Sequence, residues 1–111
     1  MPSADQPALL EVRISAPDAE VAQALADLLV GERLAACAQL VPITSTYRWQ
    51  GAVETEPEVL VLAKTTAARF AAICARVRAE HPYDNPEILA LPVAAAAEPY
   101  AAWLADAVSE E

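Results

Sequence analysis

One histidine and two cysteines are the side chains of this chain that could hold a transition metal. Cys74 lies within a predicted helix, His81 directly follows that helix, and Cys37 stands between two alanines in a predicted strand. Imidazole suits copper and zinc and thiolate suits soft metals, but a closed zinc site takes four protein ligands. One chain therefore cannot complete such a site, whereas a trimer would supply three copies of each ligand.

Each of these residues also has a structural interpretation. Cys74 fits packing on the apolar face of its helix, and Cys37 fits packing between alanines in a strand. His81 at a helix C-terminus would interact favourably with the helix dipole when it is cationic. We assign Cys74 to the core, keep His81 as a candidate for metal or ligand contact, and keep Cys37 as a candidate ligand of a soft metal.

Motifs for catalysis are absent from the sequence. The chain has two glycines, Gly31 and Gly51, so it has no glycine-rich phosphate loop, and it has no HExxH motif. A nucleophile needs an adjacent base, and no serine or cysteine motif surrounds His81. We therefore expect a protein that is not an enzyme.

A second set of residues suits a cleft for an organic ligand. Lys64 ends a predicted strand, where it extends to solvent, binds an anion, or pairs with an acid such as Glu87 across a subunit boundary. Core or interface packing is the default role of Tyr47, Trp49 and Tyr83. The alternative is that they line a cleft between subunits.

The aromatic residues belong to a long hairpin within 35–65. Before Gln50-Gly51, β-branched and aromatic residues alternate with polar ones, and after it a second strand runs from Val53 to Thr65. A strand of roughly 14 residues spans about 46 Å, whereas a domain of this length is about 35 Å across. The hairpin must therefore protrude, bend or pair with another chain, and we expect strand pairing between subunits.

Details of the hairpin follow from its prolines and charges. Pro42 and Pro57 lack an N–H and predict either a bulge or an unpaired edge position. A change in the parity of the apolar residues after Glu58 favours the bulge. Arg48 is expected near Glu54 or Glu56 across the strands, with the register uncertain by one residue.

The other elements complete a β-α-β-β-α-β order with an extra C-terminal helix. Strands are predicted at Leu9–Ser15 and Glu87–Val93. Helices are predicted from Ala16-Pro17-Asp18 to Gly31, from a Thr65-Thr66 cap to the residues before Pro82, and from Glu98-Pro99, the last with Tyr100, Trp103, Leu104 and Val108 on one face. This order predicts an α+β, ferredoxin-like fold with both main helices on one sheet face. The other sheet face is apolar and calls for further subunits.

Charge and composition exclude several classes of partner. The net charge of −9 argues against nucleic acid and anionic membranes, and no apolar run approaches the roughly 20 residues that cross a bilayer. The polar N-terminus has no secretory signal, so the two cysteines predict reduced thiols and a cytoplasmic protein. We expect a flexible tail at 1–8 and a single domain at 9–108.

Five runs occur in order along the chain, namely ERLAAC at 32–37, ITSTYRWQG at 43–51, LAKT at 62–65, HPYDNPEILALPV at 81–93 and Tyr100 to Trp103. In combination they resemble the CutA family, named for divalent-cation tolerance, over essentially 12–108. The resemblance implies a ferredoxin-like homotrimer in the cytoplasm that serves tolerance of copper and other divalent metals. The fold and trimer also resemble those of PII-type signalling proteins, which implies a ligand-sensing alternative.

The family motif makes His81 a copper-contact candidate. Some members have a second histidine just before it, where this chain has Glu80, and some have a metal-binding cysteine where it has Ile14. A glycine often found ahead of the last helix is Ala96 here. The sequence thus leaves two hypotheses, a trimeric metal-tolerance protein that binds a divalent cation weakly and a PII-like module with a small ligand or an unidentified protein partner.

Overall fold

The computed structural model describes residues 7–110, so most of the predicted N-terminal tail lies outside the described residues. The predicted order of elements is confirmed, with a short 3₁₀ helix added. The elements are β1 (Leu9–Ala16), α1 (Ala19–Gly31), β2 (Cys37–Trp49), β3 (Ala52–Thr66), η1 (Ala67–Arg69), α2 (Phe70–Glu80), β4 (Ile88–Pro92) and α3 (Glu98–Ala107).

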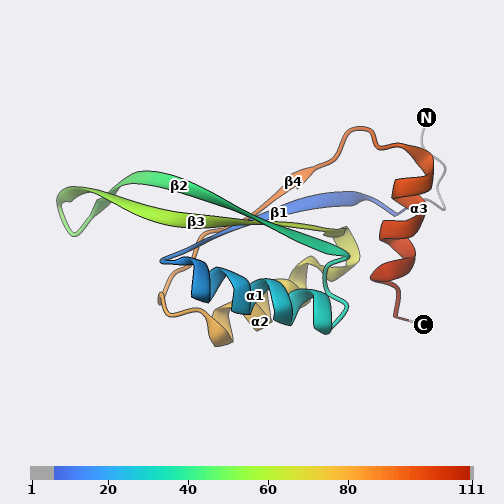
Figure 1. Ribbon diagram of the computed structural model, residues 1–111, viewed down its shortest axis with the longest axis horizontal. Helices are drawn as coiled ribbons and strands as arrows, with labels where there is room; N and C mark the ends of the chain where they lie inside the picture. The colour runs from blue at the N-terminus through green and yellow to red at the C-terminus, as the bar shows by residue number, and fades with distance from the viewer. Residues whose placement is uncertain (1–6, 111) are drawn as a thin grey trace.

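The strands form one antiparallel sheet in the order β2-β3-β1-β4. Helices α1 and α2 cover one face of this sheet, and α3 lies at the end of the sheet away from the hairpin (Figure 1). The opposite sheet face, which we call the open face, carries no helix in the part of the chain that the structure describes. None of the helices in residues 7–110 is long and apolar enough to cross a membrane.

The core lies between the sheet and the two helices. Val12 and Ile14 of β1 and Val61 of β3 are fully buried, as a period of two requires of a strand with one covered face. Leu29 and Ile73 complete the core from α1 and α2. The apolar periodicity of the sequence therefore located the buried faces correctly.

Helix α1 begins and ends where its sequence signals predict. The Asp18 carboxylate accepts a 2.9 Å hydrogen bond from the Val21 N–H, which satisfies one of the unpaired donors of the first turn. Gly31 is the last helical residue, but the left-handed conformation belongs to Arg33, with φ of 61°. The chain reversal after α1 therefore depends on Arg33 and not on glycine.

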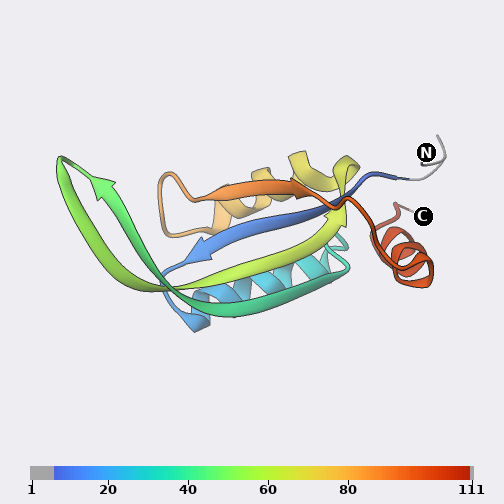
Figure 2. The same ribbon diagram turned by 90° about the horizontal axis from the view of Figure 1, so that it is seen from above.

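The hairpin extends beyond the body of the molecule and curls (Figures 1 and 2). The molecule measures 47 × 27 × 21 Å, so of the three alternatives the single chain shows protrusion together with bending (Figure 2), and pairing with another chain stays a prediction. Gln50 and Gly51 form a two-residue turn with φ of 48° and 80°, a pair of positive values that suits the twist of antiparallel strands. Arg48 pairs with Val53, so the prediction that it lies near Glu54 or Glu56 is wrong by one residue.

The predicted bulge at the prolines is also wrong. The pairing of β2 with β3 runs without interruption from Cys37 opposite Lys64 to Trp49 opposite Ala52. The edge alternative holds, because Pro42 lies on the outer strand β2 and Pro57 lies before Val59, where β3 begins to pair with β1. A missing N–H costs no ladder hydrogen bond at such positions.

Two predictions about the later helices need correction. Thr66 ends β3 and occupies the predicted N-cap position, there of η1, but its side chain makes no capping hydrogen bond, while the Thr65 hydroxyl donates a 2.6 Å hydrogen bond to the Leu34 carbonyl. In α3 the side chain of Leu104 is buried, but Tyr100 and Trp103 are 43% and 48% exposed. These aromatics pack on each other, with ring centroids 5.5 Å apart, and not on the core.

Candidate functional site

A groove of about 750 Å³ lies between the hairpin and the loop that follows α2. We call it the hairpin groove. It unites four of the residues that the sequence assigned to a cleft, namely Tyr47, Trp49, Tyr83 and Glu87. The remaining lining residues are Ser15, Ser45, Thr46, Glu56, Glu58, Pro82, Asp84, Asn85 and Pro86.

The hairpin register explains which side chains face the groove. Ser45, Tyr47 and Trp49 alternate along β2 and therefore share one face. Ser45 lies opposite Glu56 in β3, so the aromatic and acidic residues occupy the same side of the ribbon. The sequence predicted the aromatics but missed the acids of the hairpin. The signal was present, because Glu54, Glu56 and Glu58 also alternate.

A hydrogen bond closes one side of the groove. The Tyr83 hydroxyl donates to the Glu58 carboxylate at 2.9 Å. Burial first, and then this hydrogen bond and the negative charge of Glu58, raise the pKa of Tyr83 to about 12. Burial and the neighbouring carboxylate of Glu56 also raise the pKa of Tyr47. Both phenols are therefore protonated donors at neutral pH.

The groove is negatively charged. Glu56 and Glu58 from β3 and Asp84 and Glu87 from the loop contribute carboxylates, and its described lining residues include no lysine, arginine or histidine. Cations are therefore attracted to this surface, and anions are repelled. Carboxylates and water suit hard divalent cations.

His81 is 7% exposed and both of its ring nitrogens have partners. Nδ1 accepts a 3.1 Å hydrogen bond from the Tyr83 N–H, and Nε2 lies 2.7 Å from the Ser15 carbonyl oxygen. Since a carbonyl only accepts, Nε2 carries the proton and the ring is the neutral tautomer. β4 pairs with β1 only as far as Ile14, which leaves the Ser15 carbonyl to His81. A metal could bind the lone pair of Nδ1 only after the hydrogen bond from the Tyr83 N–H to Nδ1 is broken.

Cys37 and Lys64 lie away from the hairpin groove. They face each other across β2 and β3 on the open face, where the Lys64 ammonium contacts the Glu11 carboxylate at 2.5 Å. Glu11 also binds the Arg13 guanidinium at 2.9 Å, and these two partners, Lys64 first, lower the pKa of Glu11. Within the chain the partner of Lys64 is therefore Glu11, which the sequence analysis missed, and not Glu87.

The two predicted metal ligands do not meet within one chain. Cys37 aligns through Lys64 with Glu11, whereas His81 binds Ser15, four positions further along β1. Four strand residues span roughly 13 Å. Among residues 7–110, moreover, no group of three or more His, Cys, Asp or Glu side chains is placed to hold a metal. Metal binding by His81 or Cys37 stays a prediction, and any closed site needs ligands from a second chain.

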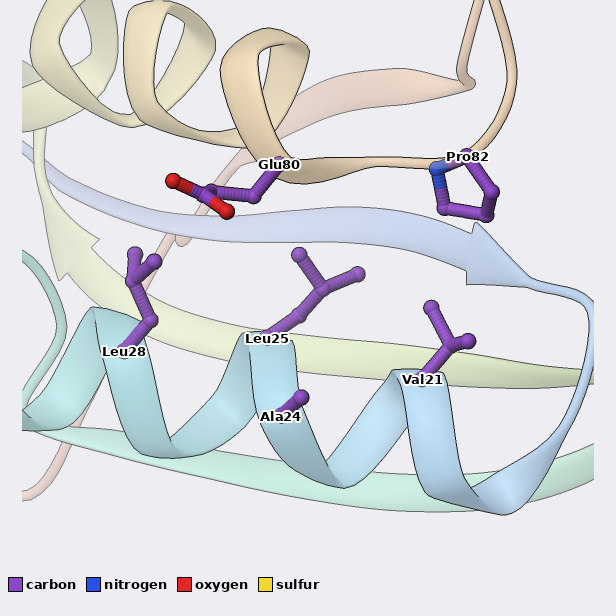
Figure 3. Close-up of a pocket in the computed structure, with 6 residues that line it drawn as sticks. All are labelled: Val21, Ala24, Leu25, Leu28, Glu80 and Pro82. Carbon is purple, nitrogen blue, oxygen red and sulfur yellow. The ribbon is translucent and has the colours of Figure 1, made fainter.

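A second hollow of about 280 Å³ lies between the two main helices (Figure 3). Val21, Leu25 and Leu28 of α1 point toward Glu80, the last residue of α2, and toward Pro82 in the loop after it, as Figure 3 shows. Its walls are mostly aliphatic. The Arg76–Glu32 ion pair at 2.9 Å joins the two helices.

Comparison with known proteins gives a consistent result. Residues 10–107 match the family described as CutA1 divalent ion tolerance protein. The divalent-cation tolerance protein CutA of Thermus thermophilus is 51% identical over 94 residues, 84% of this chain and 91% of that protein. Its counterpart in Escherichia coli is 44% identical over 94 residues, 84% of each chain.

Solved structures agree. The crystal structure of CutA1 from Oryza sativa superposes with a TM-score of 0.91 at 36% identity, covering 96% of this chain and 98% of that one. The divalent cation tolerance protein from Thermus thermophilus has a TM-score of 0.88 at 47% identity, covering 91% and 99%. Sequence and structure therefore agree that this chain belongs to the CutA1 divalent ion tolerance protein family.

Proposed function

We propose that this protein acts in tolerance to divalent cations as a cytoplasmic homotrimer that binds such cations weakly in the hairpin groove and catalyses no reaction. Family membership supports the role in metal ion tolerance. The observation that carries the proposed site is the negative charge that Glu56, Glu58, Asp84 and Glu87 give to one groove, although these carboxylates do not converge into a ready ligand set within one chain.

Weak binding follows from the kind of ligand available. Glu58 already accepts the Tyr83 hydrogen bond, and the other three carboxylates are exposed to water. A divalent cation on such a surface would keep most of its water ligands. Copper and zinc prefer imidazole, but His81 would first have to give up its bond to the Tyr83 N–H. The groove therefore favours harder cations such as Mn²⁺. Binding of Cu²⁺ at His81 is the competing proposal for the metal site.

The proposed homotrimer rests on two unsatisfied surfaces. Strand β2 is an edge of the sheet, and a long exposed edge pairs readily with another chain. The open face carries Leu60, Leu62 and Leu91 among its charges. We assign the sheet order and the two helices to the ferredoxin-like arrangement, and we propose that neighbouring subunits cover its open face.

Calorimetric titration with Mn²⁺ and with Cu²⁺ tests the site. We expect Glu56→Gln/Glu58→Gln to weaken Mn²⁺ binding by about tenfold or more, because two charged ligands are removed. The matched control is Glu20→Gln/Glu98→Gln, which removes the same charge from exposed helix starts outside the groove. Equal affinity in the two double variants would refute the groove site.

A His81→Asn variant separates the two metal proposals. Carboxylate binding in the groove predicts that this variant still takes up Mn²⁺. If it loses Cu²⁺ while Glu56→Gln/Glu58→Gln keeps it, the copper site is at His81 and the groove is not the metal site.

A second candidate function is binding of an organic ligand in the same groove, as a PII-like sensing module. The specific observation is that Tyr47, Trp49 and Tyr83 line the groove with partly exposed rings. A volume of about 750 Å³ lies in the range of small-molecule sites and exceeds what a bare ion needs.

A further inference from the structure

We infer that the organic ligand of the hairpin groove is a small ammonium-bearing cation. This inference rests on the second candidate function proposed above, ligand binding in the groove, and names the chemical class of that ligand. The sequence suggested an anionic ligand because of Lys64. The inference drawn from the structure is a ligand of the opposite charge.

The aromatic walls supply the first part of the argument. Tyr47 is 39% exposed, Trp49 57% and Tyr83 36%, so ring surface of all three remains accessible in the chain. An organic cation near an aromatic face is attracted by the electron density of the ring, most strongly by indole. The apolar tail of such a ligand would also remove ring surface from water.

The carboxylates supply the second part. An ammonium group has three N–H donors and no acceptor, so it needs several oxygen acceptors around it. Glu56, Asp84 and Glu87 present carboxylates to the groove. The Tyr83 hydroxyl fixes Glu58 at 2.9 Å by donating to one of its oxygens, which leaves the other oxygen as an acceptor.

Within residues 7–110 of one chain, no cationic side chain lines this groove to bind an anion. Lys64 lies outside it, is 19% exposed, and is engaged with Glu11. The described lining residues include no other cationic side chain. A carboxylate or phosphate ligand would therefore meet four acidic side chains without compensation.

The test uses Trp49 as a reporter in a Trp103→Phe background, where it is the only tryptophan. The probes are n-butylammonium, 1-butanol and butyrate at constant ionic strength, which share an alkyl tail and differ in charge. We expect a saturable change in Trp49 fluorescence, and in the ring resonances of Tyr83, with n-butylammonium alone. Equal responses to butanol or butyrate, or no saturable response to n-butylammonium by either readout, would overturn the inference.

Matched variants identify the acceptors. Glu56→Gln/Glu87→Gln should raise the dissociation constant for n-butylammonium by about tenfold or more. Glu20→Gln/Glu98→Gln, with the same loss of charge, should change it by no more than about twofold. If both variants bind alike, the attraction is the general charge of the protein and the groove is not the site.

Mn²⁺ titration of the same protein keeps this inference apart from the proposed metal function. Binding of Mn²⁺ without n-butylammonium would refute the ligand class and leave the metal proposal standing. Binding of n-butylammonium, with no binding of Mn²⁺, would support the ligand class and refute the metal proposal. If both bind at the groove, excess Mn²⁺ should raise the apparent dissociation constant of n-butylammonium, because they compete for the same carboxylates.

Discussion

The hydroxyl of Tyr83 donates a 2.9 Å hydrogen bond to the carboxylate of Glu58, and this bond joins the loop after α2 to the base of the hairpin. The two residues are 25 positions apart in sequence. Both line the hairpin groove, so their contact sets how the hairpin lies over the loop. Any change at either residue should therefore alter the groove before it alters the core.

Tyr83→Phe removes the hydroxyl and keeps the ring. The folded-state pKa of Tyr83, about 12, lies above its ordinary value of 10.0. The bond therefore stabilises the fold fully below pH 10 and is lost as pH rises through about 12. We expect the variant to lose the last step of an ultraviolet tyrosinate titration and about 0.5 to 1 kcal/mol of stability at neutral pH, a figure reduced for solvent exposure.

Tyr100→Phe is the control for that experiment, because the ring of Tyr100 contacts Trp103 on α3, outside the hairpin groove. It should keep the late titration step. If Tyr83→Phe also keeps that step, the Tyr83–Glu58 bond does not govern the titration.

Glu11→Gln should destabilise the protein by about 1 to 2 kcal/mol at neutral pH, because Lys64 and Arg13 lose their shared half-buried partner. Lys64 and Arg13 lower the pKa of Glu11 below its ordinary value of 4.5. The stabilisation is therefore present above pH 4.5 and is lost as pH falls through the lower, folded-state pKa. Urea unfolding at a series of pH values measures this.

The difference between wild type and Glu11→Gln should accordingly shrink in acid. Glu32→Gln breaks the exposed Arg76 pair and should cost less, since water screens it. A difference for Glu11→Gln that persists unchanged in acid would mean that packing, and not charge, accounts for its effect.

Trp49→Ala should weaken the proposed trimer. Trp49 is 57% exposed at the end of the hairpin, and exposed tryptophan often anchors an interface, where truncation costs about 2 kcal/mol or more. Sedimentation of wild type at micromolar concentration should give the mass of three subunits, and its melting temperature should rise with protein concentration. The variant should dissociate at higher concentration than wild type does.

Trp103→Ala is the matched control, since Trp103 is 48% exposed on α3, outside the hairpin. A monomeric wild type would refute the trimer. Equal dissociation of the two variants would show that the hairpin tryptophan is not a particular anchor.

The elements were predictable from the sequence because their signals are local. Alternation predicted the strands, a 3.6-residue period predicted α1 and α2, and Asp18 marked the start of α1. The pairing register of the hairpin strands was not predictable to one residue. It depends on the length of the Gln50-Gly51 turn, which is set by strand twist and by φ values that the sequence alone does not reveal. The same uncertainty placed Arg48 opposite the wrong residue.

The site was half predictable. The aromatic residues and Glu87 were recognised by type, whereas Glu58 joined them only because the hairpin curls toward the loop that carries Tyr83. The pairing of Lys64 with Glu11 within the chain was missed, because Glu11 lies 53 residues away on a strand that becomes its neighbour only in the folded sheet. Long-range pairing of this kind leaves no mark in a local pattern.

The last prediction concerns His81, whose ring joins β1 to the loop. His81→Ala would leave the Ser15 carbonyl and the Tyr83 N–H without their ring partners, and we expect a loss of about 2 to 3 kcal/mol. Asparagine places an acceptor near the position of Nδ1, so His81→Asn should recover part of this loss. Arg78→Ala, on an exposed position of α2, should stay close to wild type.

The same variants test whether His81 positions the groove. His81 holds the Tyr83 backbone, and Tyr83 in turn holds Glu58. In His81→Ala the pKa of Tyr83 should therefore return from about 12 toward 10.0, although neither Tyr83 nor Glu58 has changed. In His81→Asn it should stay high. If Tyr83 titrates as in wild type in the alanine variant, the imidazole stabilises β1 and the helix end without positioning the groove.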